Sequence, residues 1–227
     1  MKVSLCLLAW NELEGCKIDV PNMPLNEFDE VYAVDGGSTD GTVEYLTAQG
    51  IPVYKQPKKG LNAAYIHAVE ISTCDAVVVF LLKGTISPAT LIHFRPLLEA
   101  GNELVVASRN LKGARNSEDD RLLKPRKWGV LAMASFVALL WRREGYFIRD
   151  VLHGYKGFTV SAFRKIAPVD YGLSIDLEMV VRSYRLGLKR TEFPVSEVER
   201  PFGVTRFKIL PTGVRLIKYL LREIKRK

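Results

Sequence analysis

The chain has 227 residues, of which 48% are hydrophobic and 26% are charged, with a formal net charge of +8. This length suits one α/β domain with a short extension, and the composition excludes a disordered, collagen-like or disulfide-stabilised chain. Three cysteines without a C-x-x-C pair indicate neither a disulfide framework nor a structural zinc site, which favours a reducing compartment.

The positive charge is concentrated at the C-terminal end. Residues 206–227 contain eight Lys or Arg and one Glu, which leaves 25 basic and 24 acidic residues in the rest of the chain. A protein that binds nucleic acid more often spreads its cations over a face that also exposes aromatic side chains. We therefore expect no nucleic-acid partner, and a basic RNA-associated protein is the remotest alternative.

The apolar segments are too short to cross a membrane. The start at residues 3–10 has no small-residue cleavage site after it, so it does not read as a secretory signal. The longest uncharged apolar run, Gly129–Trp141, has 13 residues. As a helix it would extend about 20 Å, less than the ~30 Å hydrocarbon core. We expect a cytoplasmic protein, either soluble or peripheral on the inner face of the membrane.

Short apolar segments alternate with helical patterns in the first half of the chain. Strands are predicted over residues 2–9, 30–35, 52–55, 76–82 and 103–107. Runs that are apolar at nearly every position are typical of parallel strands covered on both faces. Helices are predicted over residues 61–71 and 88–100, with Pro88 at the start of the second. The pattern predicts a doubly wound, mostly parallel α/β sheet with helices on both faces.

The second half is less regular. The polar segment 110–124 is predicted to be a loop, followed by helices over 127–143 and 174–186 and a strand over 189–195. We expect one domain over residues 1–205 and a basic amphipathic helix over residues 206–227. Such a helix suits the surface of an anionic membrane. The alternative is that it packs on the sheet or on a second subunit.

The segment from Asp35 to Thr42 ends a predicted strand with a carboxylate, two glycines and three side chains that can cap a helix. In a doubly wound sheet this turn lies at the carboxyl ends of the strands, where ligands bind. A carboxylate there can accept hydrogen bonds from ribose hydroxyls or a base N–H. A capped turn without a ligand is the alternative.

A second polar group follows the first predicted strand, where Asn11 and Glu12 come directly after Trp10. These side chains would face the same sheet edge as Asp35 if the two strands are neighbours. Asn11 could instead cap the next helix. No G-x-G-x-x-G follows this strand and no G-x-x-x-x-G-K-[ST] occurs in the sequence, so the dehydrogenase and P-loop interpretations lose their main support.

Together these motifs resemble the family 2 glycosyltransferases with the GT-A fold, and within them the polyprenyl-phosphate sugar transferases. The family's Tyr-Asn-Glu-like motif is matched by Trp10 to Glu12, and its Asp-Asp/Gly-Gly-Ser-Thr-Asp-Gly-Thr motif by Asp35 to Thr42. Further matches are Gly60 at a Gly-rich helix start, Ala107-Ser108-Arg109 at a strand end, Gly157-Phe158 at a Ser-Gly-Phe turn, and Arg200, Gly203, Thr205 and Arg206 in an Arg-x-x-Gly-x-Ser-Lys motif.

The resemblance implies a GT-A-like, Rossmann-like enzyme that moves a sugar, with inversion, from a nucleotide-diphosphate sugar to a hydroxylated or lipid-phosphate acceptor. The donor-binding residues that it implies are Ala9, Trp10, Asn11, Glu12, Asp35, Gly36, Gly37, Ser38, Gly60, Arg200 and Arg206. Arg200 and Arg206 would face the diphosphate. Asp176 or Glu178 would lie on the acceptor side, where Glu178 could act as general base. For Glu178, a helix-dipole role on a solvated face is the alternative.

The family's metal-binding Asp-x-Asp is missing, because Leu81 and Lys83 occupy the positions of the two acids. Lys83 could supply positive charge directly to the leaving diphosphate, as a catalytic residue. Alternatively, the chain is a catalytically silent nucleotide-sugar-binding homologue or scaffold. A third interpretation is a weakly held Mn²⁺ or Mg²⁺ on Asp35 and His153. We favour an enzyme, either metal-free or with a weakly held metal, over the silent homologue, because the other polar site residues are present in order.

Overall fold

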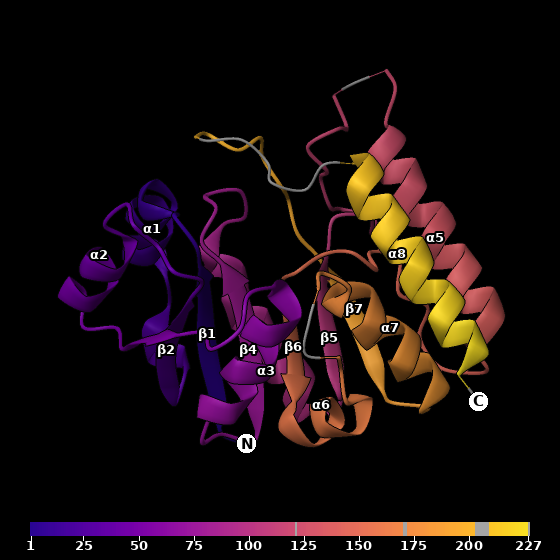
Figure 1. Cartoon of the computed structure of the whole chain (residues 1–227), viewed down its shortest axis with the longest axis horizontal. Coiled ribbons are helices and arrows are strands. Elements are labelled where there is room, and N and C mark those ends of the chain that lie inside the picture. Colours follow the sequence, from indigo (N-terminus) through magenta and orange to yellow (C-terminus); the bar gives the residue numbers. More distant parts are fainter. Residues whose placement is uncertain (121, 170–171, 203–208, 227) are drawn as a thin grey trace.

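The computed structural model describes residues 1–120, 122–169, 172–202 and 209–226, and its centre is one seven-stranded sheet (Figure 1). The strands are β1 Val3–Ala9, β2 Glu30–Asp35, β3 Val53–Lys55, β4 Ala76–Leu81, β5 Leu104–Ser108, β6 Lys156–Thr159 and β7 Arg190–Pro194. Their order across the sheet is β3-β2-β1-β4-β6-β5-β7. This arrangement confirms the predicted doubly wound sheet.

All neighbouring strands are parallel except where β6 lies antiparallel between β4 and β5. β1, β4 and β5 are buried along their whole length, as expected for strands covered on both faces. Because β6 runs the other way, it begins near the edge at which β4 and β5 end. This direction brings Lys156, its first residue, towards the carboxyl ends of the parallel strands.

Helices fill the segments between the strands. The α-helices are α1 Leu13–Asp19, α2 Thr42–Ala48, α3 Leu61–Ile71, α4 Phe94–Glu99, α5 Pro125–Trp141, α6 Val160–Ile166, α7 Ile175–Arg185 and α8 Ile209–Lys225. The 3₁₀-helices are η1 Val20–Asn22, η2 Leu25–Glu27 and η3 Pro88–His93. The helix predicted over residues 88–100 is thus η3 followed by α4, with Pro96 in the first turn of α4, where a missing N–H is tolerated.

One expectation from the sequence is wrong, and another falls outside the described residues. Gly157 and Phe158 lie inside β6 and not in a turn, because this segment pairs with both β4 and β5. The predicted boundary at residues 205 and 206 falls outside the described residues, and α8 is described from Ile209 onward. Segment 110–124 contains neither a helix nor a strand in its described part, apart from an isolated bridge between Arg115 and Ser196.

α5 and α8 lie side by side beyond the β7 end of the sheet (Figure 1). Both contact α7: α5 packs against it, and Glu223 of α8 forms ion pairs with Arg182 and Arg185 of α7. Among the described residues, no helix combines the length and the apolar character that crossing a bilayer requires.

Candidate functional site

The turns after β1 and β2 are joined by hydrogen bonds. The Gly36 N–H donates to the Ala9 carbonyl at 2.8 Å, the Asn11 N–H to Ser38 Oγ at 2.8 Å, and the Thr39 N–H to Asn11 Oδ1 at 2.7 Å. Asn11 has a left-handed backbone, with φ of 50°, a region that asparagine enters more readily than most residues. Asn11 therefore ties the two turns together and does not cap α1, whose N-cap is Glu12.

The carboxylate of Asp35 holds its own turn together. It accepts hydrogen bonds from the Gly37 N–H at 2.8 Å, the Ser38 N–H at 3.0 Å and the Ser38 hydroxyl at 2.5 Å. Gly37 adopts a φ of 94°, which a side chain would strain. The turn is thus ordered by the residues that follow the strand. Because an ionised carboxylate has about four acceptor positions, Asp35 keeps capacity for one further donor.

Trp10 covers the same turn. A Cβ atom on Gly36 would lie 3.0 Å from Trp10 Cβ and 3.1 Å from its Cγ, so only glycine allows this close approach. Trp10 is nevertheless 52% exposed. The turn therefore presents an accessible aromatic ring beside a carboxylate, a combination that suits a nucleobase and its ribose in chemical type.

A positively charged side chain reaches this edge from the C-terminal part of the chain. Arg200 forms a salt bridge with Glu12, and its guanidinium lies 5.1 Å from the centre of the Phe202 ring. The Nε of Arg200 is buried, and no hydrogen-bond partner for it lies among the described residues. Glu12 is itself fixed through its N–H, which donates to Thr42 Oγ1 at 3.0 Å. Arg206 lies outside the described residues.

The turn after β4 contains Leu81 and Lys83, the positions at which the resemblance predicts the two acids of Asp-x-Asp. Leu81 is buried, and the Tyr155 hydroxyl donates to its carbonyl at 2.6 Å. The Gly84 N–H donates at 2.9 Å to Asp19 Oδ2, a carboxylate at the end of α1 that is almost completely buried. Burial raises the pKa of Asp19 to about 6, although hydrogen bonds from the backbone of Gly84 and Lys83 oppose this change.

Lys83, in the turn after β4, lies within electrostatic range of Glu12 and Asp176. Burial lowers the pKa of its ammonium group, whereas the negative charges of Glu197, Asp176 and Glu12 act in the opposite direction. Arg109 contributes further to the lowering. Glu12 also forms a salt bridge with Arg200, so both cations lie near the start of α1, and the turn before α1 is hydrogen-bonded to the Asp35 turn.

Lys156 is a buried cation that the sequence analysis missed. Its side chain has no exposed surface, and its Nζ lies 2.8 Å from Asp176 Oδ1. A second hydrogen bond goes to the carbonyl of His153. The signal in the sequence was a single lysine within an otherwise uncharged strand. Asp176 is 13% exposed, so the structure leaves it accessible at the predicted acceptor side.

Glu178 does not lie where the sequence analysis expected it. It is fully buried, with Arg182 Nη2 at 2.7 Å and Asn62 Nδ2 at 3.2 Å from its carboxylate oxygens. Burial raises the pKa of Glu178, and Arg182 opposes this change. Glu178 lies in the first turn of α7, and there its side chain points towards Asn62 of α3. Neither a solvated helix-dipole role nor contact with an acceptor fits this position.

Gly60 also differs from its expected place. It precedes α3 with a φ of 118°, and an added Cβ would lie 3.0 Å from the carbonyl oxygen of Gly172. The Asn62 N–H donates to the same carbonyl. Gly60 therefore permits a close approach of the loop before α7, and these contacts link it to that loop and not to the Asp35 turn.

The weak metal site proposed on Asp35 and His153 is wrong. Asp35 ends β2, whereas His153 bonds through Nδ1 to the carbonyl of Ala107 on β5, and three strands lie between. At about 4.8 Å per strand, the separation is roughly 19 Å. In the part of the chain that the structure describes, no three His, Cys, Asp or Glu side chains are placed to hold a metal. The residues at the end of β4 therefore do not fit the family's divalent metal.

A buried network of ion pairs is centred on Arg109. Arg109 binds Asp150 with two hydrogen bonds, from Nε at 2.8 Å and from Nη2 at 3.0 Å, and reaches Glu197 at 3.1 Å. Arg109 holds the pKa of Asp150 well below its usual value despite burial. Since Glu197 lies near Lys83, this network also sets the electrostatic surroundings of the β4 turn.

Comparisons with known proteins identify the family of this chain. The family described as Glycosyl transferase family 2 matches residues 18–167. Glycosyltransferase AglJ of Haloferax volcanii is 28% identical over 88% of this chain and 65% of its own length, and the undecaprenyl-phosphate mannosyltransferase of Micrococcus luteus is 26% identical over 91% and 87%.

Among solved structures, glucosyl-3-phosphoglycerate synthase of Mycobacterium tuberculosis, in complex with Mn²⁺, UDP-glucose and phosphoglyceric acid, superimposes with a TM-score of 0.72. At 19% identity over 97% of this chain and 79% of that one, this likeness shows the fold, which is GT-A-like as predicted. Since the family match spans more than half of the residues, the chain belongs to glycosyltransferase family 2.

Proposed function

We propose that this glycosyltransferase moves a sugar from a nucleoside diphosphate sugar to a lipid-phosphate acceptor, with lysine in place of a divalent metal. The observation that carries the proposal is the position of Lys83. It lies within electrostatic range of Asp176 and of Glu12, and Glu12 also forms a salt bridge with Arg200. The nucleotide side, a cation for the diphosphate and an accessible carboxylate thus share one sheet edge.

The donor nucleotide would bind over the turns after β1 and β2. Trp10 offers an exposed ring for the base, while the ordered backbone at Gly36 and Gly37 permits close approach. Asp35 would accept a hydrogen bond from the base or the ribose. Its three internal hydrogen bonds mean that this turn needs little rearrangement when the nucleotide arrives.

Displacement at the anomeric carbon breaks its bond to the diphosphate oxygen, and the electron pair leaves with the nucleoside diphosphate. Lys83 and Arg200 would stabilise this charge, with Arg206 as a third candidate. Lysine supplies positive charge but no bridging coordination. Arg200 would exchange part of its contact with Glu12 for phosphate oxygens, and its buried Nε provides a further donor.

The acceptor oxygen would attack the anomeric carbon from the opposite face, which inverts its configuration. A lipid phosphate is already ionised at neutral pH and needs no strong general base. Asp176, paired with Lys156, would then orient the acceptor. A hydroxylated acceptor would instead require Asp176 to take up the proton. The similarity to an undecaprenyl-phosphate mannosyltransferase favours the phosphate.

We also propose that the protein works in the cytoplasm, peripherally at the inner face of the membrane, because a polyprenyl phosphate resides in a bilayer. No observation on the described residues favours a nucleic acid, and the positive charge has a different explanation in the helix face discussed below.

The test is a thermal-shift screen with UDP-, GDP-, CDP- and dTDP-sugars, in EDTA and in Mn²⁺, followed by transfer to polyprenyl phosphate in detergent. The matching donor should raise the melting temperature, because it binds only the folded state. Transfer should persist in EDTA. An absolute requirement for Mn²⁺ would contradict the role of Lys83, and donor binding without transfer or hydrolysis would favour the silent homologue.

A further inference from the structure

α8 presents three distinct sectors around its axis. One sector is buried against the rest of the protein, and its members are Leu216, Tyr219, Leu220 and Glu223. A second sector is apolar and exposed: Val214, Ile217, Leu221 and Ile224. The third is cationic and exposed: Arg215, Lys218, Arg222 and Lys225. Packing against the rest of the protein therefore uses only part of the apolar stripe of α8, and an additional apolar surface remains beside the cations.

α5, like α8, leaves much of its apolar surface exposed. Its segment Gly129–Trp141 has no charged residue, yet only Ala134 and Val137 are buried within the whole helix. The exposed large side chains include Trp128 at 53%, Phe136 at 46% and Leu139 at 83%. An apolar helix that folding leaves largely uncovered indicates a surface that binds something else.

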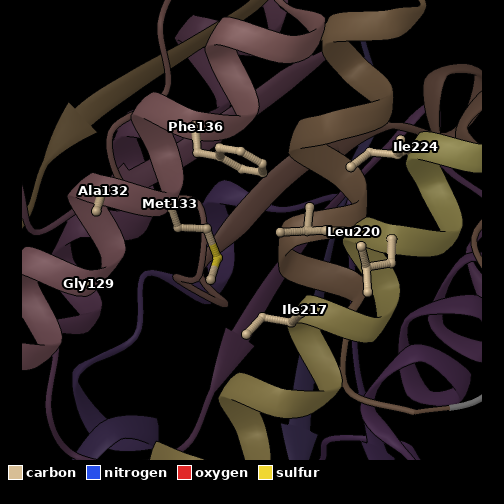
Figure 2. Close-up of a pocket in the computed structure, with 8 residues that line it drawn as sticks. Gly129, Ala132, Met133, Phe136, Ile217, Leu220 and Ile224 are labelled. Atoms are coloured by element: carbon tan, nitrogen blue, oxygen red, sulfur yellow. The ribbon is translucent and has the colours of Figure 1, made fainter.

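The two exposed faces meet in a shallow groove of about 380 Å³. Figure 2 shows Met133 and Phe136 of α5 facing Ile217, Leu220 and Ile224 of α8 across this groove. Its remaining lining residues are Gly129, Ala132 and Leu221. All eight are apolar, so the groove suits hydrocarbon.

The charges on the two helices indicate which kind of partner would bind at the groove. α5 contains two cations and no acidic residue, and the one acid of α8, Glu223, is buried and paired with Arg182 and Arg185 of α7. The helix pair therefore exposes cations and no carboxylate in its described residues. A second copy docked by two-fold symmetry would bring these cations together, whereas anionic lipid headgroups would neutralise them.

We propose that the joint face of α5 and α8 is a docking surface for an anionic bilayer, with acyl chains seated in the groove and headgroups at the cationic sector. Both helices begin at the end of the molecule where the strands of the candidate site also end (Figure 1). A membrane held there would present a lipid-phosphate acceptor near the site. The inference deepens the proposed function, although membrane binding is measured without any donor or acceptor.

The experiment is flotation of the full chain with vesicles of phosphatidylcholine, or of phosphatidylcholine with 30% phosphatidylglycerol. We expect binding to the anionic vesicles and much weaker binding to the neutral ones, with release as salt rises. The double variant Ile217→Glu/Leu221→Glu should lower binding more than tenfold. Its matched control is Ile92→Glu, which places a charge on a similarly exposed isoleucine of η3 and should leave binding unchanged.

A second pair of variants tests the cations. Arg215→Gln/Lys218→Gln should lower binding to anionic vesicles about 25-fold, since each surface cation contributes a factor of about five. Arg164→Gln/Lys165→Gln, which removes two exposed cations from α6, should have little effect. All four variants should keep the thermal shift caused by the donor, so a failure of sugar transfer and a failure of docking are separable.

Two results would overturn the inference. One is equal binding to neutral and anionic vesicles. The other is a stable dimer that Ile217→Glu/Leu221→Glu dissociates, together with no vesicle binding by the unaltered chain, which would assign the face to a second copy.

Discussion

The turn after β2 and the turn after β4 lie at the same sheet edge but are stabilised in opposite ways. After β2, Asp35 accepts hydrogen bonds from Gly37 and Ser38, two and three residues further along the chain. After β4, the carboxylate that holds Gly84 comes from Asp19, which is 65 residues away in the sequence. The first turn is locally determined, and the second depends on how α1 packs.

This difference separates the two halves of the proposed site. The turn after β2 contains Asp35 and its local hydrogen bonds. The turn after β4 contains Leu81 and Lys83 at the positions where the resemblance predicts two acids, and the buried Asp19 of α1 holds the backbone there. The turn that differs from the expected motif is thus held by a side chain from α1, a distant part of the sequence. The following variants probe each half, from the largest expected effect to the smallest.

Lys83→Gln should lower kcat about 10²- to 10³-fold in EDTA, because it removes the charge that stabilises the leaving diphosphate. The measurement is initial rates of transfer with the donor that gives the largest thermal shift. The melting temperature of the variant is measured as well, so that a loss of rate is separated from a loss of folding. A reduction of less than threefold in kcat would show that the β4 turn plays no electrostatic role.

Gly15→Ala should reduce the free energy of unfolding by about 3 kcal/mol or more, through overpacking between α1 and the β4 turn. The added methyl would lie 2.1 Å from the carbonyl oxygen of Leu82, a backbone atom that cannot rotate away. Urea denaturation measures the change. Gly129→Ala is the control, since it meets no atom within 4 Å and should slightly stabilise α5.

Asp19→Asn should stabilise the protein at pH 7 and leave it nearly unchanged near pH 4. Burial raises the pKa of Asp19 from 3.8 to about 6, so the folded state binds the proton more tightly than the unfolded state. The stability from this proton is present below pH 4 and is lost as the pH rises through about 6, by up to about 3 kcal/mol. Urea denaturation between pH 4 and 7 should show this dependence only in the unaltered chain.

Asp35→Ala should reduce the free energy of unfolding by about 2 kcal/mol, because it leaves the N–H groups of Gly37 and Ser38 without their acceptor. It should also abolish the thermal shift caused by the donor. Asp35→Asn keeps one acceptor oxygen, so its free energy of unfolding should lie between those of Asp35→Ala and the unaltered chain. If Asp35→Ala were as stable as the unaltered chain, the turn would not depend on local hydrogen bonding.

Prediction from the sequence succeeded where the local structure depends on residues that are close together in the sequence. Every strand of the described sheet except β6 was predicted within one residue, and Asn11 and Asp35 were correctly expected at one sheet edge. It failed for Glu178 and Lys156, whose surroundings come from distant elements. Asp176 and Glu178 are two residues apart on α7, and only the packing of α3 and α8 shows that the second is buried.

The amino-acid sequence by itself determined the strands other than β6 and the turn at Asp35, because apolar periodicity, glycines and side-chain chemistry act over a few residues. Only the tertiary structure decided that β6 runs antiparallel and places Lys156 beside Asp176, that Asp19 supports the turn of Lys83, and that α8 leaves part of its apolar stripe uncovered. These features depend on contacts between segments far apart in the chain, where burial and charge are set by the neighbours that folding supplies.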